Sequence, residues 1–347
     1  MRRAITLAER GVGFTSPNPC VGAVVVKDSR IIGEGYHRKA GMPHAEIEAL
    51  RSCIEDSSKA TMYVTLEPCT HEGKTPPCTS AIRDAGIKRV VIGTRDPNPN
   101  VSGNGAMQLQ HYGIEVTVGV EEHSCRHLIR HFARWATVGI PSVICKVAVS
   151  KDYKIAAAVG KRTSITSEQA QKEVHTLRHA VDAIIVGAGT VAVDDPFLTD
   201  RSEGAKSDPL RIILDGTLRT SVDANVYKDA NVFVAATDKA SETQKEKFQM
   251  AGIPIVIFPK EDDGISLPSL LAYLGKKQIT SLLVEGGGRT IDSFMRKNYI
   301  NEWHIFQSTD ILGPEAVDIC SDIVVFKSII KNAESRPCGR DTYFLAC

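Results

Sequence analysis

The sequence lacks the features that mark several large classes of protein. No apolar run approaches the roughly 18 residues that a membrane-spanning helix needs, so we expect no transmembrane segment. The first ten residues carry charges where a signal peptide needs an apolar stretch, which predicts a cytoplasmic protein. Aromatic residues make up only 6%, and 42 Lys and Arg against 41 Asp and Glu leave a formal net charge of +1. This balance disfavours nucleic acid as a partner, because nucleic-acid-binding proteins carry a basic excess.

Cysteine is present in an odd number and without a regular pattern. Nine Cys residues scattered over 347 residues do not form a disulfide framework and fit a reducing compartment with a few thiols used for chemistry. The length alone predicts about two domains. Gly and Pro between Val138 and Pro141 predict a linker there. The expected domains are therefore residues 1–139 and 140–347.

Both halves alternate strand-like and helix-like segments, which is typical of layered α/β domains. In the first half, strands are expected over 21–26, 31–36, 62–66, 89–93 and 114–118, and helices over 45–53, 78–85 and 121–137. In the second half, strands are expected over 142–148, 183–186, 211–214, 231–235, 253–258, 281–284 and 304–307, and helices over 167–179, 267–275 and 290–297.

The strongest chemical signal is the pair His44-Ala-Glu46 with two later Pro-Cys steps, at Cys69 and Cys78. Zinc binds one imidazole and two thiolates readily, and three protein ligands leave a fourth position for water. A zinc ion lowers the pKa of such a water, and a nearby carboxylate can carry its protons. His-x-Glu followed by two Cys is the pattern of zinc deaminases. We predict one zinc ion on His44, Cys69 and Cys78, with Glu46 as the catalytic acid and base.

Proline residues directly before His44 and Cys78 predict that a helix begins at each of these two ligands. The positive end of a helix dipole favours negative charge, which helps to keep Cys78 as a thiolate.

A structural zinc site is the alternative, and it would need a fourth protein ligand. The candidate is His71, inside the eight-residue segment between the two cysteines. The same segment carries Lys74, so it also suggests a substrate-binding flap for a phosphate. An ordinary solvated lysine would explain Lys74 equally well.

Five segments together resemble the bifunctional deaminase/reductase family of riboflavin biosynthesis (RibD/RibG type). They are Thr15-Ser-Pro-Asn-Pro-Cys-Val-Gly22, Gly41-Met-Pro-His-Ala-Glu46, Val64-Thr-Leu-Glu-Pro-Cys69, Gly73-Lys-Thr-Pro-Pro-Cys78 and Asp96-Pro-Asn-Pro99. The resemblance covers nearly the whole chain. It implies a cytidine-deaminase-like α/β/α domain, then a dihydrofolate-reductase-like α/β domain that uses NADPH. It also implies that Asn18 lies in the deaminase pocket, although a turn would explain a Pro-Asn-Pro residue, and that Lys74 meets the substrate phosphate.

The reaction that this resemblance implies has two steps. The first is hydrolytic deamination of 2,5-diamino-6-ribosylamino-4(3H)-pyrimidinone 5′-phosphate to 5-amino-6-(5-phosphoribosylamino)uracil. The second is NADPH-dependent reduction of the ribosyl to the ribityl side chain. The resemblance further implies a homodimer formed through the reductase domain.

In the second half, an apolar strand runs into Gly286-Gly-Gly288 and then a helix-like segment. Glycine lets the backbone approach a phosphate closely, and a helix N-terminus supplies N–H donors, although such a cluster is often only a turn. By resemblance, the NADPH contacts are Ala148, Ser164, Thr190, Asp194, Gly216, Gly287, Gly288, Arg289, Thr290, Ile291, Asp292 and Ser293. By the same resemblance, the substrate contacts are Lys146, Arg162, Thr166, Arg178, Leu198, Arg201 and Glu285.

Two positions depart from the usual family pattern. Tyr153 stands where the family usually has Gly, and Ser164 stands where it often has Trp. We expect Tyr153 to remove backbone freedom and to add bulk near the cofactor.

Three further His residues, His123, His127 and His131, recur every four residues in a segment expected to be one helix. The neighbouring Arg residues favour a solvated basic face over a metal site.

Two rival functions follow from the same residues. A nucleic-acid deaminase predicts basic patches and stacking aromatics, and the composition offers few of either. A zinc-stabilised binding protein predicts four protein ligands and no use for Glu46.

Overall fold

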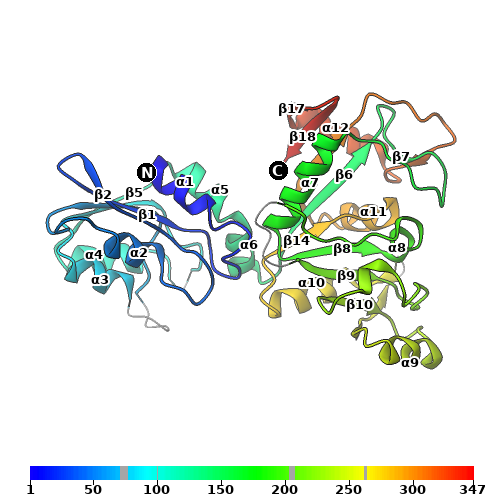
Figure 1. Cartoon of the computed structure of the whole chain (residues 1–347), viewed down its shortest axis with the longest axis horizontal. Helices are drawn as coiled ribbons and strands as arrows, with labels where there is room; N and C mark the ends of the chain where they lie inside the picture. Colours follow the sequence, from blue (N-terminus) through cyan, green and yellow to red (C-terminus); the bar gives the residue numbers. More distant parts are fainter. Residues whose placement is uncertain (71–76, 100, 203–207, 262–263) are drawn as a thin grey trace. The chain divides into compact units, whose positions relative to one another are not determined.

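The computed structural model describes residues 1–70, 77–99, 101–202, 208–261 and 264–347. The chain divides into two compact units, Met1–Gly139 and Ile140–Cys347, and Figure 1 shows each as strands covered by helices. Among the described residues, no helix is long and apolar enough to cross a membrane.

The first unit is built on a five-stranded sheet in the order β2-β1-β3-β4-β5. Its strands are β1 (Gly22–Lys27), β2 (Arg30–Tyr36), β3 (Thr61–Leu66), β4 (Arg89–Thr94) and β5 (Glu115–Val118). β1 runs antiparallel to both of its neighbours, whereas β3, β4 and β5 are parallel. The β1–β2 hairpin turns at Asp28 and Ser29, as expected, with positive φ at both residues.

Six helices among the described residues accompany this sheet: α1 (Arg2–Glu9), α2 (Ala45–Arg51), α3 (Cys78–Asp84), α4 (Asn104–His111), α5 (Glu122–Leu128) and α6 (Arg130–Val138). α2 lies very close to β2 because that strand carries Gly33 and Gly35 at the contact. A Cβ atom at these glycines would lie 2.4 Å from the carbonyl oxygen of Ala49 and 2.6 Å from that of Ala45. The small residues therefore fix the position of α2, whose N-terminus carries His44.

The second unit is built on a nine-stranded sheet in the order β11-β10-β9-β8-β14-β6-β15-β18-β17. The strands from β11 to β15 in this order are parallel, and β18 and β17 add antiparallel pairs at one edge. Their bounds are β6 (Ser142–Val149), β8 (Ala183–Gly187), β9 (Leu210–Leu214), β10 (Val232–Ala236), β11 (Ile255–Ile257), β14 (Ser281–Val284), β15 (Ile300–Gln307), β17 (Glu334–Cys338) and β18 (Asp341–Ala346). Two short pairs complete the strands: β12 (Lys260–Glu261) with β13 (Gly264–Ile265), and β7 (Lys154–Ala156) with β16 (Val317–Asp318).

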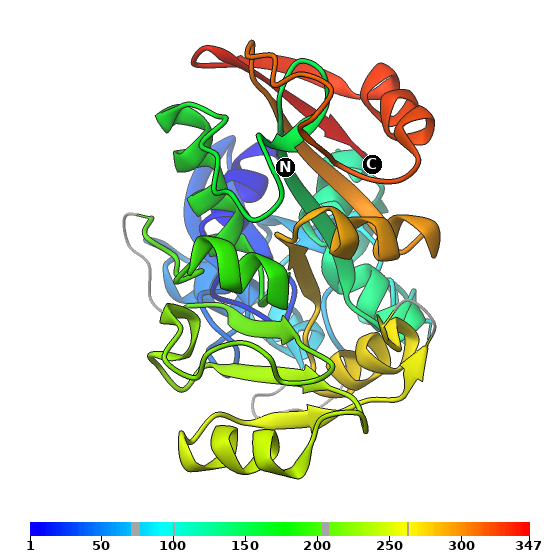
Figure 2. The same cartoon turned by 90° about the vertical axis from the view of Figure 1, so that its right-hand side faces the viewer.

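Helices cover both faces of this sheet (Figures 1 and 2). α10 (Leu267–Lys276), α11 (Gly288–Arg296) and α12 (Ile323–Asn332) contribute side chains to one apolar core. α7 (Glu168–Ala180), α8 (Ala188–Asp194) and α9 (Glu242–Met250) contribute to cores on the other face. A 3-10 turn, η1, spans Asn225–Tyr227.

Most expected strands and helices are confirmed, but the segment 121–137 is not one helix. It breaks at Ile129 into α5 and α6, because Ile129 has φ of −105° and ψ of 11°. His123 and His127 therefore lie on α5 and His131 on α6, so they do not share one helical face. α1, α4, α8, α9 and α12 were not expected from the sequence.

Candidate functional site

The three predicted zinc ligands come together in the first unit. His44 is the residue before α2, Cys69 follows β3, and Cys78 is the first residue of α3. The Nδ1 atom of His44 lies 3.6 Å from Sγ of Cys69 and 3.3 Å from Sγ of Cys78. All three ligand atoms lie within 4.8 Å of one another. Within the described ranges, this is the only group of three or more such side chains with metal-ligand spacing.

Electrostatics in this cluster favour a bound cation. Hydrogen bonds from Cys78 and His44 lower the pKa of Cys69 to about 4, while its closeness to Cys69 raises the pKa of Cys78. Two neighbouring sulfur atoms cannot both carry charge unless a cation offsets the repulsion. One imidazole and two thiols at this spacing therefore fit a zinc ion as a donor set.

Glu46 lies in the first turn of α2 and is only 4% exposed. Burial raises the pKa of its carboxyl group to about 7, and the carboxyl group makes a hydrogen bond with Cys78. A carboxyl group with a pKa near neutrality can both take up and release a proton, which is what a general acid and base requires.

Asn18, which the family resemblance places in the pocket, is held by His37. Asn18 Nδ2 lies 3.1 Å from His37 Nε2, and His37 Nδ1 lies 3.1 Å from the carbonyl oxygen of Pro43. The imidazole of His37 also meets that of His44 edge to face, with ring centroids 5.5 Å apart. No spacing pattern in the sequence predicts a role for His37, because it is an isolated His after a strand.

Glu67 is a second residue whose role no sequence pattern predicts. Its buried carboxylate accepts hydrogen bonds from the backbone N–H groups of Asp96 at 3.1 Å, Gly103 at 2.9 Å and Ala106 at 2.9 Å. It therefore ties the loop after β4 and the start of α4 to the strand end that carries Cys69. His71 and Lys74 lie outside the described residues.

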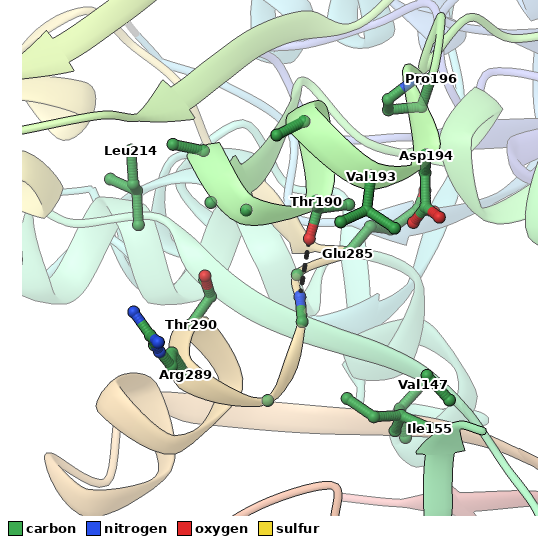
Figure 3. Close-up of a pocket in the computed structure, with 18 of the residues that line it drawn as sticks. Val147, Ile155, Thr190, Val193, Asp194, Pro196, Leu214, Glu285, Arg289 and Thr290 are labelled. Atoms are coloured by element: carbon green, nitrogen blue, oxygen red, sulfur yellow. Dashed lines mark hydrogen bonds between the residues drawn. The ribbon is translucent and has the colours of Figure 1, made fainter. Parts of the chain in front are cut away.

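The second unit contains a cavity of about 1870 Å³. Its walls include the start of α11 and the loop before it, α8, the end of β6 and the segment from Ile155 to Thr166. Figure 3 shows Thr190 and Asp194 extending from α8, and Arg289 and Thr290 extending from α11. The cavity is large enough for a dinucleotide together with a second small molecule.

The glycine run before α11 is shaped for close backbone approach. The N–H of Gly287 donates to Oγ1 of Thr190 at 3.0 Å (Figure 3). A Cβ atom at Gly288 would lie 2.9 Å from the carbonyl oxygen of Ile319, and one at Gly187 would lie 2.7 Å from Oγ1 of Thr290. Glycine is therefore required at these positions, and the N-terminus of α11 faces the cavity with N–H groups that suit a phosphate. This wall fits the pyrophosphate of a dinucleotide cofactor.

A buried ionic group lies in the wall of the same cavity. Arg178 donates two hydrogen bonds to the carboxylate of Glu285, at 2.7 and 2.9 Å. Burial lowers the pKa of Lys146 and raises that of Asp194. Charges taken out of water in this way, beside a cavity, mark candidate functional groups.

Nearly all predicted reductase residues line this cavity. The lining contains Lys146, Ala148, Arg162, Ser164, Thr166, Arg178, Thr190, Asp194, Leu198, Arg201, Gly216, Glu285, Gly287, Gly288, Arg289, Thr290, Asp292 and Ser293. Of the predicted reductase residues, Ile291 alone is not in this lining, because its side chain is fully buried in the core.

Tyr153 differs from expectation in one respect. Its φ of 64° confirms a backbone position that favours glycine. Its ring, however, packs against Phe326 with centroids 6.2 Å apart and beneath the amino group of Lys327, and it is not among the described residues that line the cavity. The bulk of the ring therefore lies beside α12 and outside the described lining of the cavity.

Comparisons with known proteins match both units. Residues 1–94 match the family model described as the cytidine and deoxycytidylate deaminase zinc-binding region, and residues 141–344 match the RibD C-terminal domain. The riboflavin biosynthesis protein RibD of Aquifex aeolicus is 42% identical over 313 residues, which cover 90% of this chain and 87% of that protein. The corresponding protein of Escherichia coli is 37% identical over 334 residues, which cover 92% of this chain and 90% of that protein.

Solved structures agree with these relatives. Acinetobacter baumannii RibD superimposes with a TM-score of 0.88 at 34% identity, covering 99% of this chain and 96% of the other. A Thermotoga maritima structure described as a diaminohydroxyphosphoribosylaminopyrimidine deaminase and 5-amino-6-(5-phosphoribosylamino)uracil reductase superimposes with a TM-score of 0.85 at 38% identity, covering 100% of this chain and 97% of the other. The fold is therefore a cytidine-deaminase-like unit followed by a RibD reductase unit. The chain belongs to the RibD family of riboflavin biosynthesis proteins, the bifunctional deaminase/reductases that use zinc and NADPH.

Proposed function

We propose that residues 1–139 deaminate 2,5-diamino-6-ribosylamino-4(3H)-pyrimidinone 5′-phosphate and that residues 140–347 then reduce its ribosyl group. The observation that carries the first step is the approach of His44, Cys69 and Cys78 within 4.8 Å, beside the buried carboxyl group of Glu46. Zinc held by these three residues would lower the pKa of a water at its fourth position and so make it a better nucleophile.

Glu46 is the residue that moves protons in this step. The water oxygen bonds to C2 of the pyrimidinone ring while the adjacent ring nitrogen, which was double-bonded to C2, takes up one proton. The bond from C2 to the exocyclic amino nitrogen then breaks, C2 becomes a carbonyl, and the amino group leaves as ammonia. The carboxylate of Glu46 takes the two protons of the water in turn and passes the first to the ring nitrogen and the second to the departing nitrogen. A pKa of about 7 suits both transfers near neutral pH. We assign Asn18, which contacts His37, to orienting the ring by hydrogen bonds from its amide.

The second step takes place in the cavity of the reductase unit. NADPH, when bound, supplies a hydride for C1′ of the ring-opened sugar. Glu285 and Arg178 form a fixed ion pair there, and Lys146 lies close enough to Glu285 to act on it electrostatically. We assign these three residues to substrate binding, with Arg178 and Arg201 on the 5′-phosphate because a guanidinium group binds phosphate in a bidentate manner.

One experiment tests both halves of this proposal. The purified full-length chain is given the diaminopyrimidinone substrate and NADPH, and ammonia release, NADPH oxidation and zinc content are measured together. We expect about one zinc ion per chain, release of ammonia, and NADPH oxidation that follows it. Ammonia release from a metal-free preparation would contradict the first step, and NADPH oxidation that does not respond to the deaminated product would contradict the second.

We further propose a cytoplasmic homodimer formed through the reductase unit. The structure places no disulfide among the nine cysteines, which fits a reducing compartment. Light scattering on the full-length chain, compared with a chain truncated after residue 139, tests whether the dimer depends on the reductase unit.

A further inference from the structure

The C-terminal part of α7 holds the segment 199–201 of the second unit. His175, Arg178 and His179 lie at spacings of three and four residues, so they share one face of the helix. Each of them makes a hydrogen bond with a different residue of the segment. Arg178 donates from Nη1 to the carbonyl oxygen of Thr199 at 3.2 Å. The other two contacts fix the residues that follow.

Arg201 is held through both its backbone and its side chain. Its N–H donates to Nδ1 of His175 at 3.3 Å. Burial, together with the charges of Arg178 and Arg201, lowers the pKa of His175, so the ring is neutral and can accept this hydrogen bond. The guanidinium donates from Nε to Oγ1 of Thr199 at 3.3 Å and lies 5.6 Å from the ring centre of Phe197. The direction of the Arg201 side chain therefore depends on the backbone that carries it.

Asp200 joins this segment to His179. Its side chain is 1% exposed, and Oδ2 lies 2.8 Å from Nδ1 of His179. Oδ1 accepts hydrogen bonds from the N–H of Ser202 at 2.8 Å and from its hydroxyl at 2.6 Å. Burial alone would raise the pKa of Asp200, but the hydrogen bonds from Ser202 and His179 outweigh it and lower this pKa. Since an ionised carboxylate only accepts, Nδ1 of His179 carries the hydrogen.

Asp200 and His179 lie behind the cavity wall. The described lining contains His175, Arg178 and Arg201 but neither member of this pair. Taking a carboxylate out of water is costly, and its hydrogen bonds often do no more than offset that cost. Stability alone is therefore a poor explanation for the pair, whereas its place directly before Arg201 gives it a means to act on the cavity.

We infer that Asp200 and His179 are positioning residues that fix Arg201 for the substrate phosphate and act only through Arg201. The inference rests on the proposed function, which assigns Arg201 to the 5′-phosphate. A guanidinium binds phosphate strongly only when its two donors meet two oxygens, so a small displacement of the backbone at Asp200 weakens the contact. The pair makes the reductase selective for a phosphorylated substrate without taking part in hydride transfer.

The test is steady-state reduction by the full-length chain with NADPH. The two substrates are 5-amino-6-(5-phosphoribosylamino)uracil and the same compound without its phosphate. The variants are Asp200→Asn, His179→Ala, His179→Asn, Arg201→Ala and the double variant with Asp200→Asn and Arg201→Ala. Asp182→Asn is the matched control, because its carboxylate accepts two hydrogen bonds from Thr280 at 2.7 Å and lies outside the described lining. Denaturant unfolding of each variant measures its stability.

We expect Asp200→Asn and His179→Ala to raise KM for the phosphorylated substrate by about 3- to 10-fold, as for loss of one hydrogen bond. We expect kcat, the KM for NADPH and kcat/KM for the phosphate-free substrate to stay within about 2-fold. His179→Asn restores an N–H donor and should lie closer to the unchanged chain. Arg201→Ala should raise KM by about 10- to 100-fold, and the double variant should lose nothing more. Asp182→Asn should lower stability without changing either KM.

Several results would overturn the inference, and they are distinguishable. Unchanged KM in Asp200→Asn and His179→Ala, or an equal loss with the phosphate-free substrate, would remove the positioning role. A double variant clearly worse than Arg201→Ala would show that Asp200 acts by another route. An Arg201→Ala variant with unchanged KM would refute the assignment of Arg201 while leaving the reductase function standing. Failure of the unchanged chain to reduce the phosphorylated substrate would refute the proposed function itself.

Discussion

Glu46 shows how its position changes the acid–base behaviour of one residue. A glutamate in water is ionised at neutral pH, but the start of α2 buries this carboxyl group beside His44 and Cys78. Burial disfavours the charged form, so the group can exchange a proton near neutrality. The sequence predicted this role from the His-x-Glu spacing, because ligand and carboxylate share the beginning of one helix.

We expect Glu46→Gln to retain zinc but to lose most deaminase activity. The amide has the shape of the carboxyl group but cannot carry a proton, and general acid–base catalysis contributes about 10²- to 10⁴-fold. Ammonia release and zinc content of the purified variant measure the effect. Reduction of the deaminated substrate serves as the internal control, since Glu46 belongs to the other unit. Deaminase activity within a few-fold of the unchanged chain would refute the role.

Tyr153 has a backbone conformation that is unfavourable for a residue with a side chain. A side chain at positive φ costs about 1 kcal/mol or more, whereas glycine avoids that cost. The contacts of the ring with Phe326 and Lys327 stabilise the folded state and offset part of this free-energy cost.

Tyr153→Ala should therefore destabilise the chain more than Tyr153→Gly, by about 1 kcal/mol, because Ala loses the ring but keeps the strain. Denaturant unfolding of the two variants measures the difference. The affinity for NADPH should stay unchanged in both, since the ring is not among the described residues that line the cavity. Greater stability of the Ala variant would contradict this account.

At the scale of elements, the ends of helices and strands carry the chemistry. The sequence predicted that α2 and α3 begin at His44 and Cys78, because proline precedes both residues. It did not predict α4. Gly103, the residue directly before α4, adopts positive φ and donates its N–H to the carboxylate of Glu67. That contact joins residues 36 positions apart in the sequence, and no local pattern contains it.

Glu67→Gln should loosen this connection. The substitution replaces one acceptor oxygen with an NH₂ group. This group is a donor and faces backbone N–H groups that now donate hydrogen bonds to Glu67, so we expect the free energy of unfolding to fall by about 1–3 kcal/mol. Because Glu67 immediately precedes the Pro68-Cys69 step, we expect weaker zinc retention during dialysis against a chelator, with NADPH binding unchanged. Glu55→Gln, on an exposed ion pair with Arg30, is the control. Equal zinc retention in both variants would argue against a positioning role.

For the second unit, local patterns predicted the strands better than the cavity. The runs that form β6, β8, β9 and β14 are apolar and β-branched, so they were recognisable as buried strands. The contact between Thr190 and Gly287 and the pair between Arg178 and Glu285 each join distant segments. Arg178 was expected only through family resemblance, since spacing alone favours a solvated arginine.

At the scale of the whole molecule, the proposed zinc ligands all lie in residues 1–139, and the described lining of the cavity lies wholly in residues 140–347. Removing zinc with a chelator should therefore abolish ammonia release and leave NADPH oxidation with the deaminated substrate intact. Adding zinc back should restore ammonia release. Parallel assays of both activities on one preparation measure this. Loss of NADPH oxidation on chelation, or its recovery only with zinc, would show that the reductase unit depends on the metal.

The two glycines of β2 that lie against α2 have a consequence for how this enzyme tolerates sequence change. Gly33 and Gly35 are not among the proposed zinc ligands, yet one additional methyl group at either position would collide with the backbone of α2. α2 would have to move away from β2, and the imidazole of His44, the residue directly before α2, would move with it. In a library of random variants, we therefore expect substitutions at Gly33 and Gly35 to be tolerated as poorly as substitutions at the proposed catalytic residues. Loss of bound metal should be the first defect detected in these variants.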